Sequence, residues 1–466
     1  MVFSSIVFLY IFLPIMLLLY FIVPSKFKNA IMILASLVFF AWGEIRYILI
    51  MLLLAVMDFF CGKKITKYYD NKKKRLLYLL IDVIVNLLIL FFFKYADFII
   101  SNINTVTGLN IPLLNIPLPI GVSFNTFQSL SYIIDVYRGT VKCEKSFYNY
   151  LTYTTLFPQI IAGPIVRYET VDEELETKNI SMNNFSMGMK RFIIGLGKKV
   201  LIANNVGALW HVIEMGNYSE LSVLFAWTGI IAFALQIYFD FSGYSDMAIG
   251  LAKIFGMEFD ENFNYPYISR SITEFWRRWH ITLSSWFKDY IYIPLGGNRK
   301  GFAKQIRNIL IVWFLTGAWH GASWNFILWG VYFGVILILE KLFILKLLEK
   351  LPKIIRHLYS IVLILVGWAI FAFEDLSKVI NYIKAMFTNN IIYNSEALYY
   401  FNNYIFIIVI GIICSIPLWK KLKEKIDSKN SKTLEFVTTL GYVAILILST
   451  ASLVTDSFNP FLYFRF

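Results

Sequence analysis

Apolar stretches separated by short polar or basic segments occupy most of the chain. A helix of about 20 apolar residues is long enough to cross the hydrocarbon core of a bilayer. Because some stretches are short or interrupted, the pattern predicts an all-α integral membrane protein with roughly ten spanning helices plus re-entrant helices. The stretches lie at Phe3–Ile22, Ala30–Trp42, Ile45–Cys61, Leu76–Phe98, Phe192–Ile213, Leu221–Phe239, Ile361–Phe373, Tyr404–Leu418 and Phe436–Leu453.

Basic residues gather beside these stretches. Lys63–Arg75 forms one basic cluster, and Lys420–Lys432 forms another between the last two stretches. Positively charged loops stay in the cytoplasm, so we predict that both clusters are cytoplasmic and that residues 454–466 form an extracellular C-terminal tail. The first stretch has no basic leader and no small-residue cleavage site, and we expect it to be retained.

Composition agrees with a membrane location, since 58% of the residues are hydrophobic and 16% are charged. The formal charge of +13 is explained by the cytoplasmic loops, and we expect no nucleic-acid partner. Three cysteines show neither disulfide nor metal-ligand spacing. No metal site is therefore expected.

A single histidine interrupts one of the apolar runs. His320 lies within Ile309–Leu339, and no Asp, Glu, Lys, Arg or other His occurs between Arg307 and Glu340. An ionisable group at membrane depth is costly, so it usually faces a bundle interior or a water-lined cavity. The indole of Trp319 on one side and a glycine on the other suit a histidine beside a narrow channel.

Two acids, Asp240 and Asp246, interrupt a second apolar run. They either pair with groups on neighbouring helices or line a reaction tunnel. In the second interpretation Gly243 would loosen the helix between them. The sequence leaves both interpretations open.

The segment Pro266–His280 interleaves aromatic rings with Arg277 and Arg278. It predicts an amphipathic helix near the interface, with its arginines facing lipid phosphate. Alternatively, the planar guanidinium groups would bind the phosphates of an anionic donor such as coenzyme A. His280 fits either a structural hydrogen bond or catalysis.

Three motifs in combination resemble the membrane-bound O-acyltransferase superfamily: Arg277–His280, Ile293–Arg299 and Thr316–Gly321. Further segments extend the resemblance toward the alginate O-acetyltransferase membrane-subunit group; they are Gly121–Tyr132, Asp135–Arg138 and Phe157–Pro164. The resemblance implies a ring of tilted helices around a central tunnel, in which His320 is the catalytic histidine and His280 the second one. Residues 1–466 would form a single membrane acyltransferase domain, with 221–340 as its catalytic half.

Acyl transfer from a thioester to a hydroxyl needs a base, which a neutral imidazole provides. We predict His320 as that base. The donor is expected to be acetyl-CoA or an acyl carrier protein thioester, and no bound cofactor is expected. Candidates for orienting the reactants, binding the donor or lining the tunnel are His280, Trp319, Asn325, Arg277, Arg278, Asp240 and Asp246.

The C-terminal pattern Phe461-x-Tyr463-x-x-Phe466 resembles the terminal motif of the small peptide that partners the teichoic-acid D-alanylation transferase. The resemblance makes Tyr463 a candidate acyl acceptor. Asp456 stands where the longer motif has a phenylalanine. Aromatic anchoring at the membrane interface is the competing interpretation.

Together these features predict an O-acyltransferase of the bacterial cytoplasmic (inner) membrane. It would move acetyl groups from a cytoplasmic thioester across the bilayer for O-acetylation of a cell-surface or exported polysaccharide. The resemblance implies an extracellular SGNH-type acetyltransferase as its partner. The alternatives are a lipid acyltransferase of the same superfamily and a proton-coupled transporter, although inverted halves, which would favour a transporter, are not visible.

Overall fold

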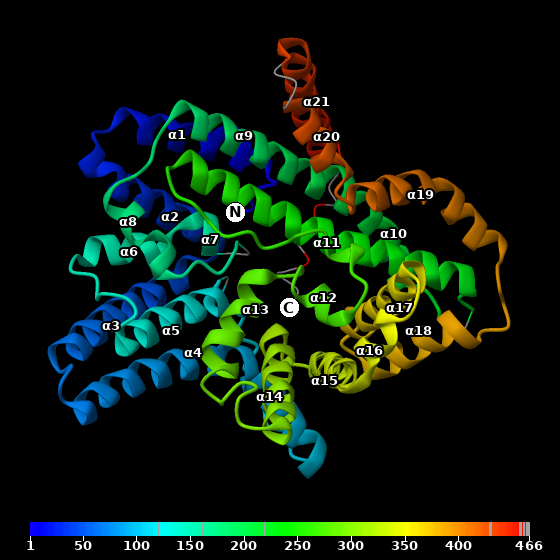
Figure 1. The fold of residues 1–466 in the computed structure, drawn as a ribbon, viewed down its shortest axis with the longest axis horizontal. Coiled ribbons are helices and arrows are strands. Elements are labelled where there is room, and N and C mark those ends of the chain that lie inside the picture. The colour runs from blue at the N-terminus through cyan, green and yellow to red at the C-terminus, as the bar shows by residue number, and fades with distance from the viewer. Residues whose placement is uncertain are drawn as a thin grey trace. The chain divides into compact units, whose positions relative to one another are not determined.

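The computed structural model describes residues 1–119, 121–160, 163–218, 220–427 and 431–455, together with Asn459 and Leu462. Over these residues the chain is built from helices and contains no strand (Figure 1). The prediction of an all-α membrane protein is confirmed. Seven described helices are long and apolar enough to cross a membrane: Ser25–Gly43, Lys72–Thr107, Met182–Glu214, Val223–Ile254, Lys353–Ala372, Ser395–Cys414 and Lys432–Thr455.

The other spans expected from the sequence fall in described helices that are shorter or more polar than these seven, and the first apolar stretch forms the short apolar helix Phe8–Ile22. Helix α3 (Ile48–Lys67) contains Asp58 and ends in a basic turn. Helix α14 (Phe302–His320) begins with a polar turn. Helix α15 (Trp324–Leu339) has only 16 residues, because the backbone then passes into a π-helix.

The described chain divides into two compact units, residues 1–192 with 245–260, and residues 193–244 with 261–466. The boundary falls inside α9 (Met182–Gly197) and α11 (Val223–Ile254). A single domain over residues 1–466 stays a prediction. Besides α3 and the beginning of α9, the first unit contains α1 (Leu13–Ile22), α2 (Lys28–Glu44), α4 (Lys72–Thr107), α5 (Val122–Arg138), α6 (Phe147–Thr155), α7 (Phe157–Ile160) and α8 (Tyr168–Glu176).

In the first unit α3, α4 and α5 run side by side (Figure 1). A buried carboxylate, Asp58, joins three helices around α3. It accepts hydrogen bonds from Asn86 of α4 at 3.0 Å, from Ser129 of α5 at 2.5 Å and from Tyr150 of α6 at 3.0 Å. Buried polar groups in apolar surroundings need such partners, so this network fixes how the helices pack.

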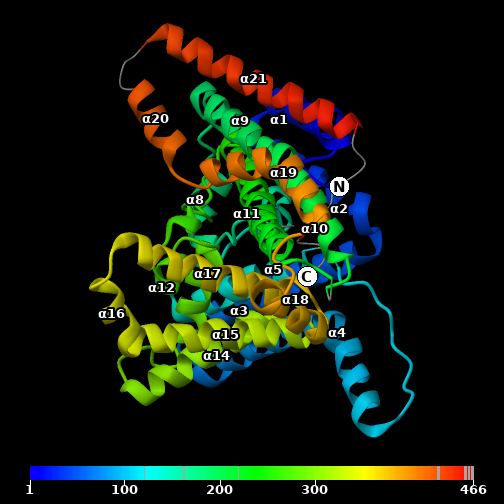
Figure 2. The same cartoon turned by 90° about the vertical axis from the view of Figure 1, so that its right-hand side faces the viewer.

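The second unit has a core of aromatic and aliphatic side chains that includes Trp210, Phe233, Trp329 and Trp368. In it α14, α15 and α17 (Lys353–Ala372) are neighbours (Figure 2). Its other helical segments are η4 (Lys198–Ala203), α10 (Asn204–Glu214), η5 (Pro266–Ile268), α12 (Ile272–Trp276), α13 (Ile281–Phe287), η6 (Lys288–Tyr292), η7 (Glu340–Ile344), α16 (Leu345–Glu349), α18 (Leu376–Thr388), α19 (Ser395–Cys414), α20 (Leu418–Asp427) and α21 (Lys432–Thr455).

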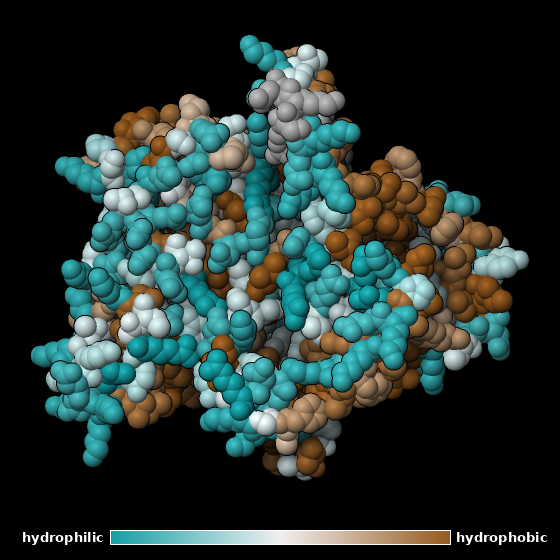
Figure 3. Space-filling model, in the orientation of Figure 1, coloured by the Kyte–Doolittle hydropathy of each residue, from teal (hydrophilic) through white to brown (hydrophobic). Residues whose placement is uncertain are grey.

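Helix α19 presents many apolar side chains outward. Phe406, Val409, Ile412 and Ile413 are exposed, and the surface over α19 is strongly hydrophobic (Figure 3). Large contiguous apolar surfaces are rare on soluble proteins. This face of α19 is therefore suited to contact with lipid.

Helices α14 and α15 approach each other through glycines. A Cβ atom added to Gly317 would overlap the carbonyl oxygen of Phe326, and one added to Gly330 would overlap that of Trp313. Small residues of this kind allow the backbones of membrane helices to come close. The contact determines where the end of α14, at His320, lies against α15.

We predict that Gly317→Ala destabilises the protein by about 1–3 kcal/mol or more, because the new methyl group forces the two helices apart. Thermal unfolding of the detergent-solubilised protein measures the loss. Gly441→Ala on α21 is the matched control, since a Cβ there would meet no atom within 4 Å. Equal melting temperatures for the two variants would contradict the close packing of α14 and α15.

Candidate active site

His320 is the last residue of α14 and is half-buried among aromatic rings. Its imidazole centroid lies 4.9 Å from the ring of Trp319, 5.0 Å from Trp329 of α15 and 5.2 Å from Phe371 of α17. Three helices therefore fix the direction of this side chain.

The indole of Trp319 contacts both candidate histidines. Its centroid lies 4.9 Å from His320 and 6.2 Å from His280. Because both imidazole rings contact this one indole, the distance between their centres is at most the sum of the two centroid distances. The fold brings together two residues that are distant in sequence and that the motifs single out separately.

His280 is buried, and one contact determines which of its two ring nitrogens carries the hydrogen. Its Nδ1 lies 3.0 Å from the amide oxygen of Asn262, which is an acceptor, so Nδ1 carries the hydrogen. Among the described residues Nε2 of His280 has no hydrogen-bond partner. The edge of the Phe241 ring packs against the imidazole at a centroid distance of 4.7 Å. Nε2 thus offers a lone pair in apolar surroundings.

The predicted amphipathic helix over Pro266–His280 is wrong in extent, because α12 covers only Ile272–Trp276. Glu340 is buried and accepts hydrogen bonds from the backbone N–H groups of Ile272 at 2.7 Å and of Thr273 at 2.8 Å. A carboxylate at this position caps the start of α12. The backbone of His280 then takes a left-handed conformation, with φ of 44°, and begins α13.

The two arginines of this segment have different surroundings. Arg278 pairs with Glu274 at 3.0 Å and donates to the carbonyl oxygen of Asn264 at 3.1 Å. The side chain of Arg277 is exposed. Their predicted role in donor binding stays a prediction.

Both acids of α11 pair with cations inside their own unit. Asp240 lies 2.5 Å from Nζ of Lys199 in the second unit, and the two side chains are 3% and 2% exposed. Asp246 lies 2.8 Å from Arg191 in the first unit. These contacts agree with the first of the two interpretations, in which the acids pair with neighbouring helices. A place in the tunnel wall stays a prediction for each acid.

Gly243 does not loosen α11, which is helical from Val223 to Ile254. A Cβ atom at Gly243 would instead lie 2.7 Å from the carbonyl oxygen of Gly195. Because Gly243 has no side chain, two helices can approach each other closely at this position. The expected loosening of the helix at Gly243 is wrong.

Asn325 lies at the start of α15 and is fully buried. Its amide nitrogen donates to the carbonyl oxygens of Ile370 at 3.4 Å and Phe371 at 3.3 Å. Asn325 therefore ties α15 to the end of α17, beside the ring that packs on His320. A direct contact of Asn325 with a substrate stays a prediction.

Sequence reasoning missed Asn262 and Glu340, which hold the segment of His280. Asn262 belongs to an ordinary polar connection, and no motif marks it. Glu340 did carry a signal, because it is the first charged residue after the apolar run that contains His320.

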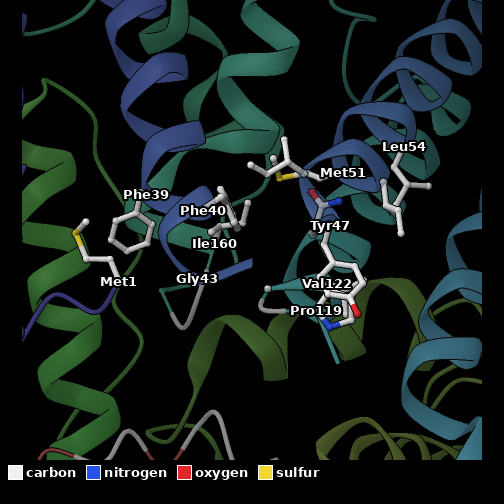
Figure 4. Close-up of a pocket in the computed structure, with 14 residues that line it drawn as sticks. Met1, Phe39, Phe40, Gly43, Tyr47, Met51, Leu54, Pro119, Val122 and Ile160 are labelled. Carbon is white, nitrogen blue, oxygen red and sulfur yellow. The ribbon is translucent and has the colours of Figure 1, made fainter. Parts of the chain in front are cut away.

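The candidate acceptor Tyr463 lies outside the described residues. A mostly apolar cavity is present in the first unit, lined by side chains that include Phe39, Phe40, Met51 and Val122 (Figure 4). None of the predicted site residues lines this cavity.

Burial lowers the pKa of His280 from 6.5 to about 3. The unfolded chain therefore binds a proton as the pH falls below 6.5, whereas the folded protein does not. We predict that His280 reduces stability by up to about 1.4 kcal/mol per pH unit in this window. Melting temperatures at pH 7.5 and pH 5 measure the effect. His280→Gln, which keeps an N–H donor, should lose less stability on acidification; an equal loss would contradict the buried neutral imidazole.

Known proteins are similar to this chain over a region that includes these residues. The model of the membrane-bound O-acyltransferase (MBOAT) family matches residues 39–373, a range that contains both histidines. The chain is 36% identical to the probable alginate O-acetylase AlgI of Azotobacter vinelandii, over 100% of both chains. It is 32% identical to the peptidoglycan O-acetyltransferase of Helicobacter pylori, over 100% of this chain and 98% of that protein.

A more distant similarity connects the chain to the teichoic acid D-alanyltransferase of Bacillus subtilis, with 29% identity over 47% of this chain and 58% of that protein. The family model covers well over half of the chain, and relatives more than 30% identical align along all of it. The chain therefore belongs to the membrane-bound O-acyltransferase family.

Proposed function

We propose that the protein takes acetyl groups from a cytoplasmic thioester and delivers them for O-acetylation of a cell-surface or exported polysaccharide. The observation that carries the proposal is the placement of His320 and His280 against the same indole, with Nε2 of His280 unpartnered among the described residues. The names of two relatives, an alginate O-acetylase and a peptidoglycan O-acetyltransferase, support acetyl as the group and polysaccharide as the final acceptor.

His320 acts as the general base in this proposal. Its imidazole takes the proton of the acceptor hydroxyl while the oxygen attacks the thioester carbonyl carbon. The carbon–sulfur bond then breaks, and the thiolate leaves with the proton from the imidazolium. A positioned base of this kind contributes about 10²–10⁴-fold to the rate. His280 would orient the acceptor through its Nε2 lone pair, which accepts a hydrogen bond.

Acetyl-CoA and an acyl carrier protein thioester are both suitable donors, since each presents its acyl group on a phosphopantetheine arm. Arg277, whose side chain is exposed, and Arg278 would bind the donor phosphates. Trp319 and Asn325 would keep the two histidines and their helices in register. Residues 221–340 would then form the catalytic half of the protein.

Tyr463 would accept the acetyl group first and pass it on. The tyrosine oxygen forms an ester bond while His320 takes its proton, and the thiol is released. An extracellular SGNH-type acetyltransferase would move the group from Tyr463 to the polymer. For these steps the protein would lie in the bacterial cytoplasmic membrane, and residues 454–466 would be reached from its outer side.

We predict that His320→Ala lowers acetyl transfer by at least about 10²-fold, because the base is lost, while the folded protein remains in the membrane. Ester content of the exported polymer and the melting temperature of the purified protein report the two effects. His211→Ala on α10, where the side chain is exposed, serves as the control. Near-normal ester content in His320→Ala would overturn the assignment of the base.

Tyr463→Phe removes one oxygen and keeps the ring, so it separates a carrier from an aromatic anchor. We expect loss of polymer acetylation and loss of label from the C-terminal peptide after incubation with isotope-labelled acetyl-CoA, read by mass spectrometry. Tyr393→Phe, at a tyrosine that is 65% exposed, is the matched control. Full activity of Tyr463→Phe would exclude the carrier role and leave the role of His320 intact.

A further inference from the structure

One described residue near the C-terminus, Leu462, lies in the core of the second unit. Leu462 is 8% exposed and belongs to the hydrophobic cluster formed with side chains of α10, α11, α17 and α19. Its backbone N–H donates to Oδ2 of Asp240 at 2.8 Å. Earlier in the segment, Asn204 of α10 donates to the side-chain oxygen of Asn459 at 3.2 Å. Asn459 and Leu462 are thus held by one hydrogen bond each, and Leu462 also packs in the hydrophobic core.

The carboxylate of Asp240 is divided between two partners. Oδ1 pairs with Lys199 at 2.5 Å, and Oδ2 accepts the N–H of Leu462. Because both charged side chains are buried, each needs the other to offset the loss of hydration. The second carboxylate oxygen would be left without a partner if the C-terminal segment were removed, and a hydrogen bond to an ionised acceptor is stronger than a neutral one.

The backbone around the ion pair is built to hold it in place. Lys199 lies in η4, where the helix widens to π geometry. A Cβ atom at Gly243 would lie 3.1 Å from the backbone nitrogen of Lys199. The glycine therefore lets α11 approach η4 closely, one turn away from Asp240. Insertions of π geometry in helices are frequent at functional sites.

We propose that Lys199 and Asp240 form a binding site for the chain's own C-terminal segment, and that this site sets the position of Tyr463 for acyl transfer. Tyr463 directly follows Leu462 in the sequence. A bond to a backbone N–H fixes the register of the segment whatever the side chains are. The inference deepens the proposed carrier role and rests on it.

Lys199 and Asp240 are positioning residues in this proposal, because they act on the segment and not on the reacting atoms. A tyrosine in an unanchored segment would reach the thioester only by chance encounter. Anchoring the neighbouring residue turns that encounter into a nearly intramolecular one, which is a large part of the rate advantage available to an enzyme.

Two double variants separate the hydrogen bond from the ion pair. Lys199→Met with Asp240→Leu removes both charges and the acceptor. Lys199→Met with Asp240→Asn removes both charges and keeps an oxygen that can accept the N–H of Leu462. Neither leaves a buried charge unpaired, and replacement of a buried pair by neutral side chains is often tolerated.

Hydrogen exchange of the C-terminal peptide reports whether the segment is bound. Mass spectrometry of Tyr463 after addition of labelled acetyl-CoA at saturating concentration reports acyl transfer. For the Asp240→Leu double variant we expect exchange at least about 10-fold faster and acetylation of Tyr463 about 10–100-fold slower, with an unchanged KM for the donor. The Asp240→Asn double variant should lie between it and the wild-type protein in both measurements.

A second test uses α10 and leaves the ion pair intact. Asn204→Ala removes the contact with Asn459 and should speed exchange of the same peptide several-fold. Asn205→Ala is the matched control, since its exposed side chain donates to the carbonyl oxygen of Leu201. If the double variants fail to fold, the comparison of Asn204→Ala with Asn205→Ala still tests whether the C-terminal segment is bound.

The possible results point in different directions. Unchanged exchange in Asn204→Ala, or equal exchange in the two double variants, would overturn the binding site. Faster exchange with wild-type acetylation of Tyr463 would overturn positioning while the carrier role stands. Absence of label on Tyr463 in the wild-type protein would reject both the carrier role and the positioning of Tyr463, and the exchange data would still decide whether the segment is bound.

Discussion

The glycine-mediated contact between α14 and α15 controls the geometry of the candidate site. Neither Gly317 nor Gly330 has room for a Cβ atom, so the two backbones meet directly. This contact sets the end of α14 against α15, and the ring of Trp329 then packs on His320. Asn325 adds the end of α17 to the same arrangement through two backbone carbonyl groups. The imidazole therefore takes its direction from backbone packing on three helices.

Several buried polar groups inside the apolar units have a defined partner, which offsets the cost of burying them. Glu340 uses its charge to cap α12, and Asn262 uses its amide oxygen to hold Nδ1 of His280. Asp240 uses Lys199 for charge balance and the C-terminal segment for its remaining oxygen. Nε2 of His280 is one of several buried side-chain atoms that have no hydrogen-bond partner among the described residues.

Much of the architecture was predictable from the sequence, because hydrophobic length is a local property. Runs of apolar residues reveal helices that suit a bilayer wherever no charge interrupts them, as in α19 and α21. In α3 the apolar length is shorter, because Asp58 and a basic turn interrupt it. The same reasoning misjudged Pro266–His280, where the α-helix covers only Ile272–Trp276. In that segment Glu340, which is distant in the sequence, caps the start of α12, and the helix ends before the left-handed backbone of His280.

Local features of the sequence were enough to identify the two histidines as candidates. One feature is an ionisable side chain in a long apolar run, and the other is the set of short motifs shared with a family. Their common contact with Trp319 could not be read from the chain, because it requires α13 and α14 to meet in three dimensions. The partners of Asp240 were hidden for the same reason, since Lys199 and Leu462 come from distant parts of the chain. Hydrophobic stretches and motifs are local features, so they can be recognised in the sequence itself. Contacts between distant helices arise from close packing and charge neutralisation, and these exist only once the helices have assembled.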